Sequence, residues 1–244
     1  MDTAWDLSEQ DVLDLPVDEL AFRALHYIKA TNEWNLYNWL NSFRNRGVRG
    51  PALRALSEAG EWLRTHGLVA WNPDQSDAQA IFITRLGERA LADGLPTIRA
   101  IHRLDIDLLP ELQARARPQF LRGDFETASF VAMREVEVQV REQAGLRNSQ
   151  LGTALMQEAF KPPKNADGTT AGPLYRSDVD GGESVALMDL FKGAVGLFKN
   201  PPSHRRVTFD DPTEAAEIVL LADLLLRLLR KIPPATSSTP EGAI

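Results

Sequence analysis

Helical spacing of apolar residues is the feature that most constrains this chain. It is clearest in residues 211–230, where Ile218, Leu221, Leu225 and Leu228 recur every three or four positions. Asp211 can cap the first turn of that helix, and Pro212 suits its first position. Similar segments with Gly, Asn or Pro stops fill most of the sequence, while two short runs, 68–71 and 81–84, are strand-like. The pattern predicts a mainly α fold.

The chain has 244 residues, of which 43% are hydrophobic and 25% charged, and this suits one large domain or two small ones. Its longest apolar run, Ile218 to Leu229, contains Asp223 and Arg227 and is shorter than the roughly 20 apolar residues of a membrane span. The N-terminus is acidic and has no signal-peptide pattern. We therefore expect a cytoplasmic protein that makes no membrane contact.

Residue types exclude several kinds of chemistry. The sequence has no cysteine, which rules out disulfides, thiolate zinc sites, iron–sulfur clusters and cysteine nucleophiles. With four histidines, the sequence has few nitrogen ligands for a metal cluster. We expect no metal and no cofactor.

The first half of the chain predicts a small domain behind an acidic leader, residues 1–14. Residues 15–93 contain three successive helical segments, then the two strand-like runs joined by a polar turn, then a short helix that Thr84 can cap. This order resembles a winged helix-turn-helix with a small β-hairpin.

Two functions fit that domain. Residues 20–100 carry ten Lys/Arg against seven Asp/Glu although the whole chain has a net charge of −7. The candidate nucleic-acid contacts are four arginines around the start of the third helix: Arg44, Arg46, Arg49 and Arg54. The same helices hold more aromatic residues than a small core must bury, which favours a protein partner equally.

The second half predicts a bundle of four helices. Residues 94–117 form a connector with a short helix that ends or turns at Pro110. The bundle, residues 118–231, begins with a helix capped by Asp124, followed by helices at about 149–160, 183–199 and 211–230. Gly193 and Gly196 in the third helix permit close approach of a neighbour. Residues 232–244 are rich in Pro, Ser and Thr and predict a disordered tail.

Reactive residue types gather between the third and fourth helices, from Lys199 to Arg206. Pro201 and Pro202 end the helix before Ser203 and His204. Histidine transfers protons near neutral pH, and the adjacent Lys and Arg residues can stabilise a phosphodiester transition state. The other interpretation is a helix–helix turn whose basic residues offset the helix dipole.

Four stretches carry a resemblance to a known family. They are residues 120–128 (FLRGDFETA), Val136-Glu137 with Arg141, residues 186–205 (ALMDLFKGAVGLFKNPPSHR) and residues 210–217 (DDPTEAAE). Together with the N-terminal module they resemble the Ymh-type branch of the HEPN proteins. The resemblance implies a four-helix, metal-independent ribonuclease domain that forms a homodimer and often serves as a toxin or an antiviral, abortive-infection effector.

The resemblance also implies roles for individual residues. His204 matches the motif histidine, Asn200 the polar residue, and Lys199 the position that usually holds arginine. Further candidates for binding RNA phosphates complete the site: Ser203, Arg205, Arg206 and Arg122. For Arg122, next to Asp124, a place at a helix start is the competing interpretation.

Two other functional classes fit the sequence, and one ion pair in the second half has a separate interpretation. Lys199 in the arginine position also suits a catalytically silent regulator or adaptor that binds nucleic acid, and a nucleotide-binding partner of a nucleotidyltransferase is a third class. Glu137 and Arg141 lie four residues apart on one helix, a spacing typical of a plain surface ion pair.

Overall fold

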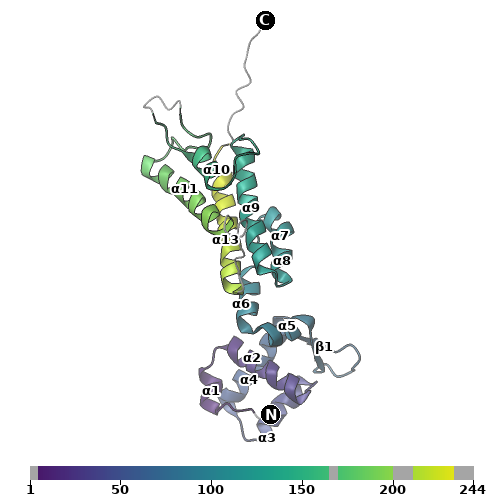
Figure 1. The fold of residues 1–244 in the computed structure, drawn as a ribbon. Coiled ribbons are helices and arrows are strands. Elements are labelled where there is room, and N and C mark those ends of the chain that lie inside the picture. Colours follow the sequence, from purple (N-terminus) through teal and green to yellow (C-terminus); the bar gives the residue numbers. More distant parts are fainter. Residues whose placement is uncertain (1–4, 165–169, 200–210, 234–244) are drawn as a thin grey trace. The chain divides into compact units, whose positions relative to one another are not determined.

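The computed structural model describes residues 5–164, 170–199 and 211–233 (Figure 1). These residues are mainly helical, as predicted, and their sheet consists of two strands. The chain divides into two compact units, residues 1–98 and 99–244. None of the helices described is long and apolar enough to cross a membrane.

The N-terminal unit follows the predicted order of elements. It contains α1 (Glu9–Asp14), α2 (Val17–Thr31), α3 (Leu36–Asn45), α4 (Gly50–Thr65), β1 (Val69–Trp71), β2 (Ile81–Ile83) and α5 (Arg85–Asp93). Helix α1 lies inside the predicted acidic leader and was not expected. It forms because Ser8 and Asp11 make a capping box, in which each side chain accepts a hydrogen bond from the other residue's backbone N–H.

The core of this unit lies between α2 and α4, with α1 and α3 also packed on α4. Trp39 of α3 is completely buried and crosses α4 at Gly60, where a Cβ atom would lie 3.2 Å from the indole ring. The aromatic residues Trp5, Tyr27 and Phe43 pack around this position. Trp39 and Phe43 thus belong to the core, whereas Trp34 and Tyr37 are exposed.

The hairpin is antiparallel, with Val69 opposite Ile83 and Trp71 opposite Ile81. Thr84 follows β2 and caps α5, as predicted: its hydroxyl accepts a hydrogen bond from the Gly87 N–H at 3.1 Å. Any side chain at Gly87 would meet the Leu68 carbonyl, so glycine is required for this close approach.

The C-terminal unit holds the four predicted helices. Helix α6 (Leu95–Arg103) spans the boundary between the units. The unit then contains α7 (Pro110–Arg115), α8 (Arg117–Leu121), α9 (Phe125–Gln143), α10 (Gly152–Phe160), α11 (Gly181–Ala194), the π-helical turn η1 (Val195–Lys199) and α13 (Pro212–Arg230). Asp124 and Asp211 cap α9 and α13, as predicted.

These helices pack as two pairs. Helix α9 lies along α13, and α10 lies against α11, where the rings of Phe160 and Phe191 are 4.8 Å apart. The turn η1 joins the pairs because it packs on both α9 and α10. Helices α11 and α13 are not among the closely packed pairs.

The connector differs from its prediction at Pro110. The sequence predicted a short helix that ends or turns there, but α6 ends at Arg103 and Pro110 is the first residue of α7. Proline suits this position because it has no N–H to leave unpaired. The Leu109 N–H donates at 2.8 Å to the buried carboxylate of Asp223 on α13, which also accepts from Arg227 Nε at 2.6 Å.

Replacing Asp223 tests this connection. Asp223→Ala leaves the Leu109 N–H without its acceptor and is expected to lower the free energy of unfolding by about 1–3 kcal/mol. Asp223→Asn keeps an acceptor oxygen and should cost less. Chemical denaturation measures both, and Arg64→Ala, which breaks the exposed pair with Glu61, serves as a control expected to cost less than about 1 kcal/mol. Equal losses for all three variants would contradict this account.

Candidate functional site

A buried carboxylate lies at the junction of α9, α10 and η1. The Glu137 side chain is only 4% exposed. Its Oε1 accepts a hydrogen bond from Arg141 Nη2 at 2.8 Å, and its Oε2 lies 3.0 Å from Lys199 Nζ and 2.7 Å from the Gly152 backbone nitrogen. We call Glu137, Arg141, Gly152 and Lys199 the Glu137 cluster. It fixes the start of α10 and the end of η1 to the middle of α9.

Local sequence explains two of these contacts. Arg141 stands four residues after Glu137, so both side chains lie on one face of α9, and Arg141 Nε also donates to the Gln150 carbonyl at 3.2 Å. Gly152 has a positive φ of 61°, which glycine adopts readily, and it begins α10 without a side-chain cap on the preceding Leu151. Glu137 therefore accepts a hydrogen bond from the Gly152 N–H, which has no partner within α10.

The third contact depends on η1. Within this turn, Gly196 approaches α10 so closely that a Cβ atom would lie 3.0 Å from Thr153 Cγ2. Packing of η1 on both α9 and α10 directs Lys199 toward Glu137, and its side chain is 13% exposed. π-Helical turns are rare and are frequent at functional sites.

The Glu137 cluster holds two cations around one carboxylate. Arg141 and Lys199 each carry one formal positive charge and Glu137 one negative charge, and little of any of these three side chains is exposed. Burial strengthens the interactions of each charge. The chain continues from Lys199 directly into Asn200–Arg206.

Glu137 and Arg141 correct one prediction. Their spacing was interpreted as a plain surface pair, but the two side chains are 4% and 12% exposed. The spacing of four residues shows only that the side chains share a face of the helix. The available signal was Glu137's place between Val136 and Val140, both buried, on a helix covered from two sides by α13 and η1.

The structure places two of the residues predicted for the RNA site. Lys199 belongs to the Glu137 cluster. Arg122 lies exposed at the end of α8, donates to Gln119 Oε1 at 3.3 Å, and precedes α9, whose axis extends about 18 Å from its start to Glu137. The structure therefore does not bring Arg122 to the cluster. The remaining predicted residues lie outside the part of the chain that the structure describes: Asn200, Ser203, His204, Arg205 and Arg206.

The four arginines of the N-terminal unit are all exposed around the turn between α3 and α4. Three have local contacts: Arg44 bonds Asn41, Arg46 reaches the Tyr27 hydroxyl at 3.3 Å, and Arg49 donates to the Val48 carbonyl at 2.8 Å. The exposed face of α4 beyond Arg54 also carries Glu58 and Glu61. Positive charge is therefore concentrated at the turn and not along the helix.

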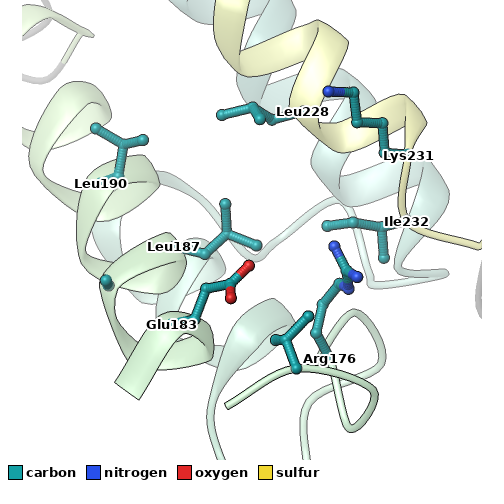
Figure 2. A pocket seen from close by; sticks show the side chains of 9 residues that line it. Arg176, Glu183, Leu187, Leu190, Leu228, Lys231 and Ile232 are labelled. Atoms are coloured by element: carbon teal, nitrogen blue, oxygen red, sulfur yellow. The ribbon is translucent and has the colours of Figure 1, made fainter. Parts of the chain in front are cut away.

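Sequence reasoning missed two hollows in the C-terminal unit. One, of about 430 Å³, lies beside Arg115 and Arg134 and includes the buried Glu135. The other, of about 240 Å³, is a groove between α11 and α13 with an apolar floor and Arg176, Glu183 and Lys231 at its edges (Figure 2). Among the residues described, no group of three or more His, Asp or Glu could hold a metal ion.

These observations define a mainly helical protein of two units whose C-terminal unit buries a carboxylate between two cations. Residues 107–229 match the model of a family described as "Protein of unknown function (Hypoth_ymh)". The match spans about half of the chain, and the chain belongs to this family. Comparison with the curated proteins gives no match. Comparison with the solved structures gives none either.

The match covers the Glu137 cluster and the segment that contains His204. It confirms the Ymh-type part of the resemblance. The HEPN superfamily, the winged helix-turn-helix and the roles of individual residues stay predictions.

Removing the central carboxylate tests the Glu137 cluster. Glu137→Ala leaves Arg141, Lys199 and the Gly152 N–H without their shared acceptor, so we expect a loss of about 3–5 kcal/mol in the free energy of unfolding. Lys199→Met retains the contacts to Arg141 and Gly152 and should cost less. The matched control is Glu61→Ala, which breaks the exposed pair with Arg64 and should cost less than about 1 kcal/mol. Denaturant titration measures all three, and a Glu137→Ala loss as small as the control's would refute the assignment.

Proposed function

We propose that this protein is a metal-independent endoribonuclease of the HEPN type, acting as a toxin or phage-defence effector. The observation that carries the proposal is the pair of little-exposed cations in the Glu137 cluster, of which Lys199 immediately precedes Asn200–Arg206 in the chain. That segment contains a histidine followed directly by two arginines. The family match covers the same residues and carries no description of an activity.

The chemistry uses the substrate's own ribose. Its 2′-oxygen attacks the adjacent phosphorus, the new O2′–P bond forms, and the bond from phosphorus to the 5′-oxygen breaks. His204 acts as the base that takes the 2′-hydroxyl proton or as the acid that protonates the leaving oxygen. Asn200 orients the phosphate. The products are a 2′,3′-cyclic phosphate and a 5′-hydroxyl.

Lys199 has a narrower role in this mechanism than the motif implies. Because its ammonium group already pairs with Glu137 and its side chain is 13% exposed, we assign it as a positioning residue that fixes the start of segment 200–206. Arg205 and Arg206 then stabilise the negative charge of the phosphate in the transition state. The proposal includes a homodimer formed through the C-terminal unit, as the resemblance implies.

Cleavage of RNA in the presence of EDTA tests this function. Purified wild-type protein is expected to cut a mixed tRNA and mRNA pool, and His204→Ala at equal concentration should be slower by about 10²–10⁴-fold, because it lacks the proton-transfer group. DNA of the same sequence should resist because it has no 2′-hydroxyl. Gel analysis and end-group mapping measure the outcome. Equal cleavage of DNA, or full activity in His204→Ala, would overturn the proposal.

A second function is favoured by the exposed arginines of the α3–α4 turn, which suit phosphate contacts by a regulator or adaptor without cleavage. For this function we expect DNA affinity to fall with salt, and each arginine that contacts a phosphate to contribute about 0.9 to the slope of log K against log salt. Arg44→Ala with Arg54→Ala should reduce that slope, while Arg64→Ala at the far end of α4 should not. Unchanged binding in the double variant would exclude this surface.

A further inference from the structure

The larger of the two hollows lies where α7 and α8 pack on α9 (Figure 1). We call it the α9 hollow. Its volume of about 430 Å³ lies within the range of roughly 300–1,000 Å³ that small-molecule sites occupy. Three helices supply its polar side chains and two valines: Arg115 of α7, Gln119 of α8, and Val131, Arg134, Glu135 and Val138 of α9.

The buried carboxylate of Glu135 fixes one wall of the α9 hollow. Its Oε2 accepts a hydrogen bond from Arg115 Nη1 at 2.8 Å, and its Oε1 accepts one from Gln139 Nε2 at 3.0 Å. The Glu135 side chain is 5% exposed, whereas that of Arg115 is 64% exposed. The guanidinium group of Arg115 is therefore held from its buried side, and its other N–H groups have no partner among the residues described.

Arg134 supplies a second guanidinium group to the same hollow. It is exposed, and no residue in the described part of the chain forms a hydrogen bond or an ion pair with this group. Val131 and Val138 stand three and four residues away on α9, so they share the face of the helix that carries Arg134. Arg134 thus contributes a cation to the α9 hollow that no structural pair uses.

Gln119 connects the α9 hollow to a third arginine. Its Oε1 accepts a hydrogen bond from Arg122 Nη1 at 3.3 Å. Because the oxygen is engaged in this way, the amide NH₂ group of Gln119 is left to donate. The sequence predicted Arg122 as a phosphate contact, and the structure separates it from the Glu137 cluster. Its hydrogen bond places it instead beside a residue of the α9 hollow.

These donors suit a phosphate group. Arg115 and Arg134 each present a planar fork of N–H groups, which matches two phosphate oxygens at once. Gln119 adds a neutral donor from a third helix. Donors that come from three helices fit the tetrahedral oxygens of a phosphate better than the two coplanar oxygens of a carboxylate. Val131 and Val138 offer apolar surface to the organic group that carries the phosphate.

The α9 hollow is distinct from the Glu137 cluster. Glu135 and Glu137 stand two residues apart on α9, and two residues turn a helix by about 200°. The two carboxylates therefore point to opposite sides of α9, Glu135 toward α7 and Glu137 toward α10. The α9 hollow is a second site and not an extension of the first.

We propose that the α9 hollow binds a phosphate group through Arg115, Arg134 and Gln119. The inference goes beyond the proposed function and does not rest on it, because none of these residues takes part in the cleavage step. Two sources present the same phosphate oxygens, a small phosphate monoester and the backbone of a nucleic-acid strand.

Isothermal titration calorimetry of the full chain tests the site and distinguishes the two sources. Ribose 5-phosphate is the small probe, and ribose is its control without phosphate. The strand probe is a 2′-O-methylated RNA octamer with hydroxyl ends, which the proposed cleavage chemistry cannot cut. We expect the wild-type protein to bind a phosphate probe and not ribose. Binding of ribose 5-phosphate indicates a monoester site, and binding of the octamer alone indicates a strand site.

Substitutions of Arg134 locate the binding. Arg134→Gln removes no structural pair and should raise the dissociation constant of the bound probe at least tenfold. Arg134→Lys keeps the charge without the planar fork, so its loss should be smaller than that of Arg134→Gln. The matched control is Arg147→Gln, which removes an exposed positive charge from the same unit after the end of α9 and should bind as the wild type does. Thermal unfolding verifies that all variants are folded.

Two results would overturn the proposal. One is that the wild-type protein binds neither phosphate probe. The other is that Arg134→Gln and Arg147→Gln bind equally well, which would mean attraction to the overall charge and not to the α9 hollow. Neither result bears on the ribonuclease, which is measured by cleavage of unmodified RNA, and a protein that cleaves no RNA can still bind phosphate here.

Discussion

A carboxylate in the interior of a protein must be surrounded by hydrogen-bond donors, and this requirement organises the C-terminal unit. Glu137 and Asp223 meet it in the same way. Each accepts a hydrogen bond from an arginine four residues later on its own helix, and each accepts a backbone N–H at the start of a distant helix that has no side-chain cap. Each carboxylate thus caps the first turn of a helix that is not its own. Because an unpaired buried charge is costly, these contacts determine where α7 and α10 begin.

Much of the fold is predictable from the sequence because the relevant signals are local. The caps at Thr84, Asp124 and Asp211 involve residues within three positions of the helix start, and the structure places all three as expected. The acidic α1 was missed although its capping box is equally local, since Ser8 and Asp11 stand in a segment with few apolar residues. Caps therefore predict helices more reliably where an apolar face accompanies them.

The candidate site was predictable only in part. Lys199 was selected from its neighbours in sequence, but its partner Glu137 lies 62 positions earlier, and the spacing to Arg141 gave the wrong exposure. No pattern of neighbouring residues in the sequence indicates that η1 and α13 both pack on α9. The position of Pro110 has a similar cause, because the acceptor for the Leu109 N–H comes from α13, more than a hundred residues away.

The π-helical turn η1 has a consequence for the direction of Lys199. A π turn holds one residue more than an α-helical turn over nearly the same rotation. If Val195–Lys199 were wound as an α-helix, the extra residue would turn Lys199 by about 100° around the axis, away from Glu137. A substitution that tightens this turn would therefore misplace the ammonium group while leaving its charge intact.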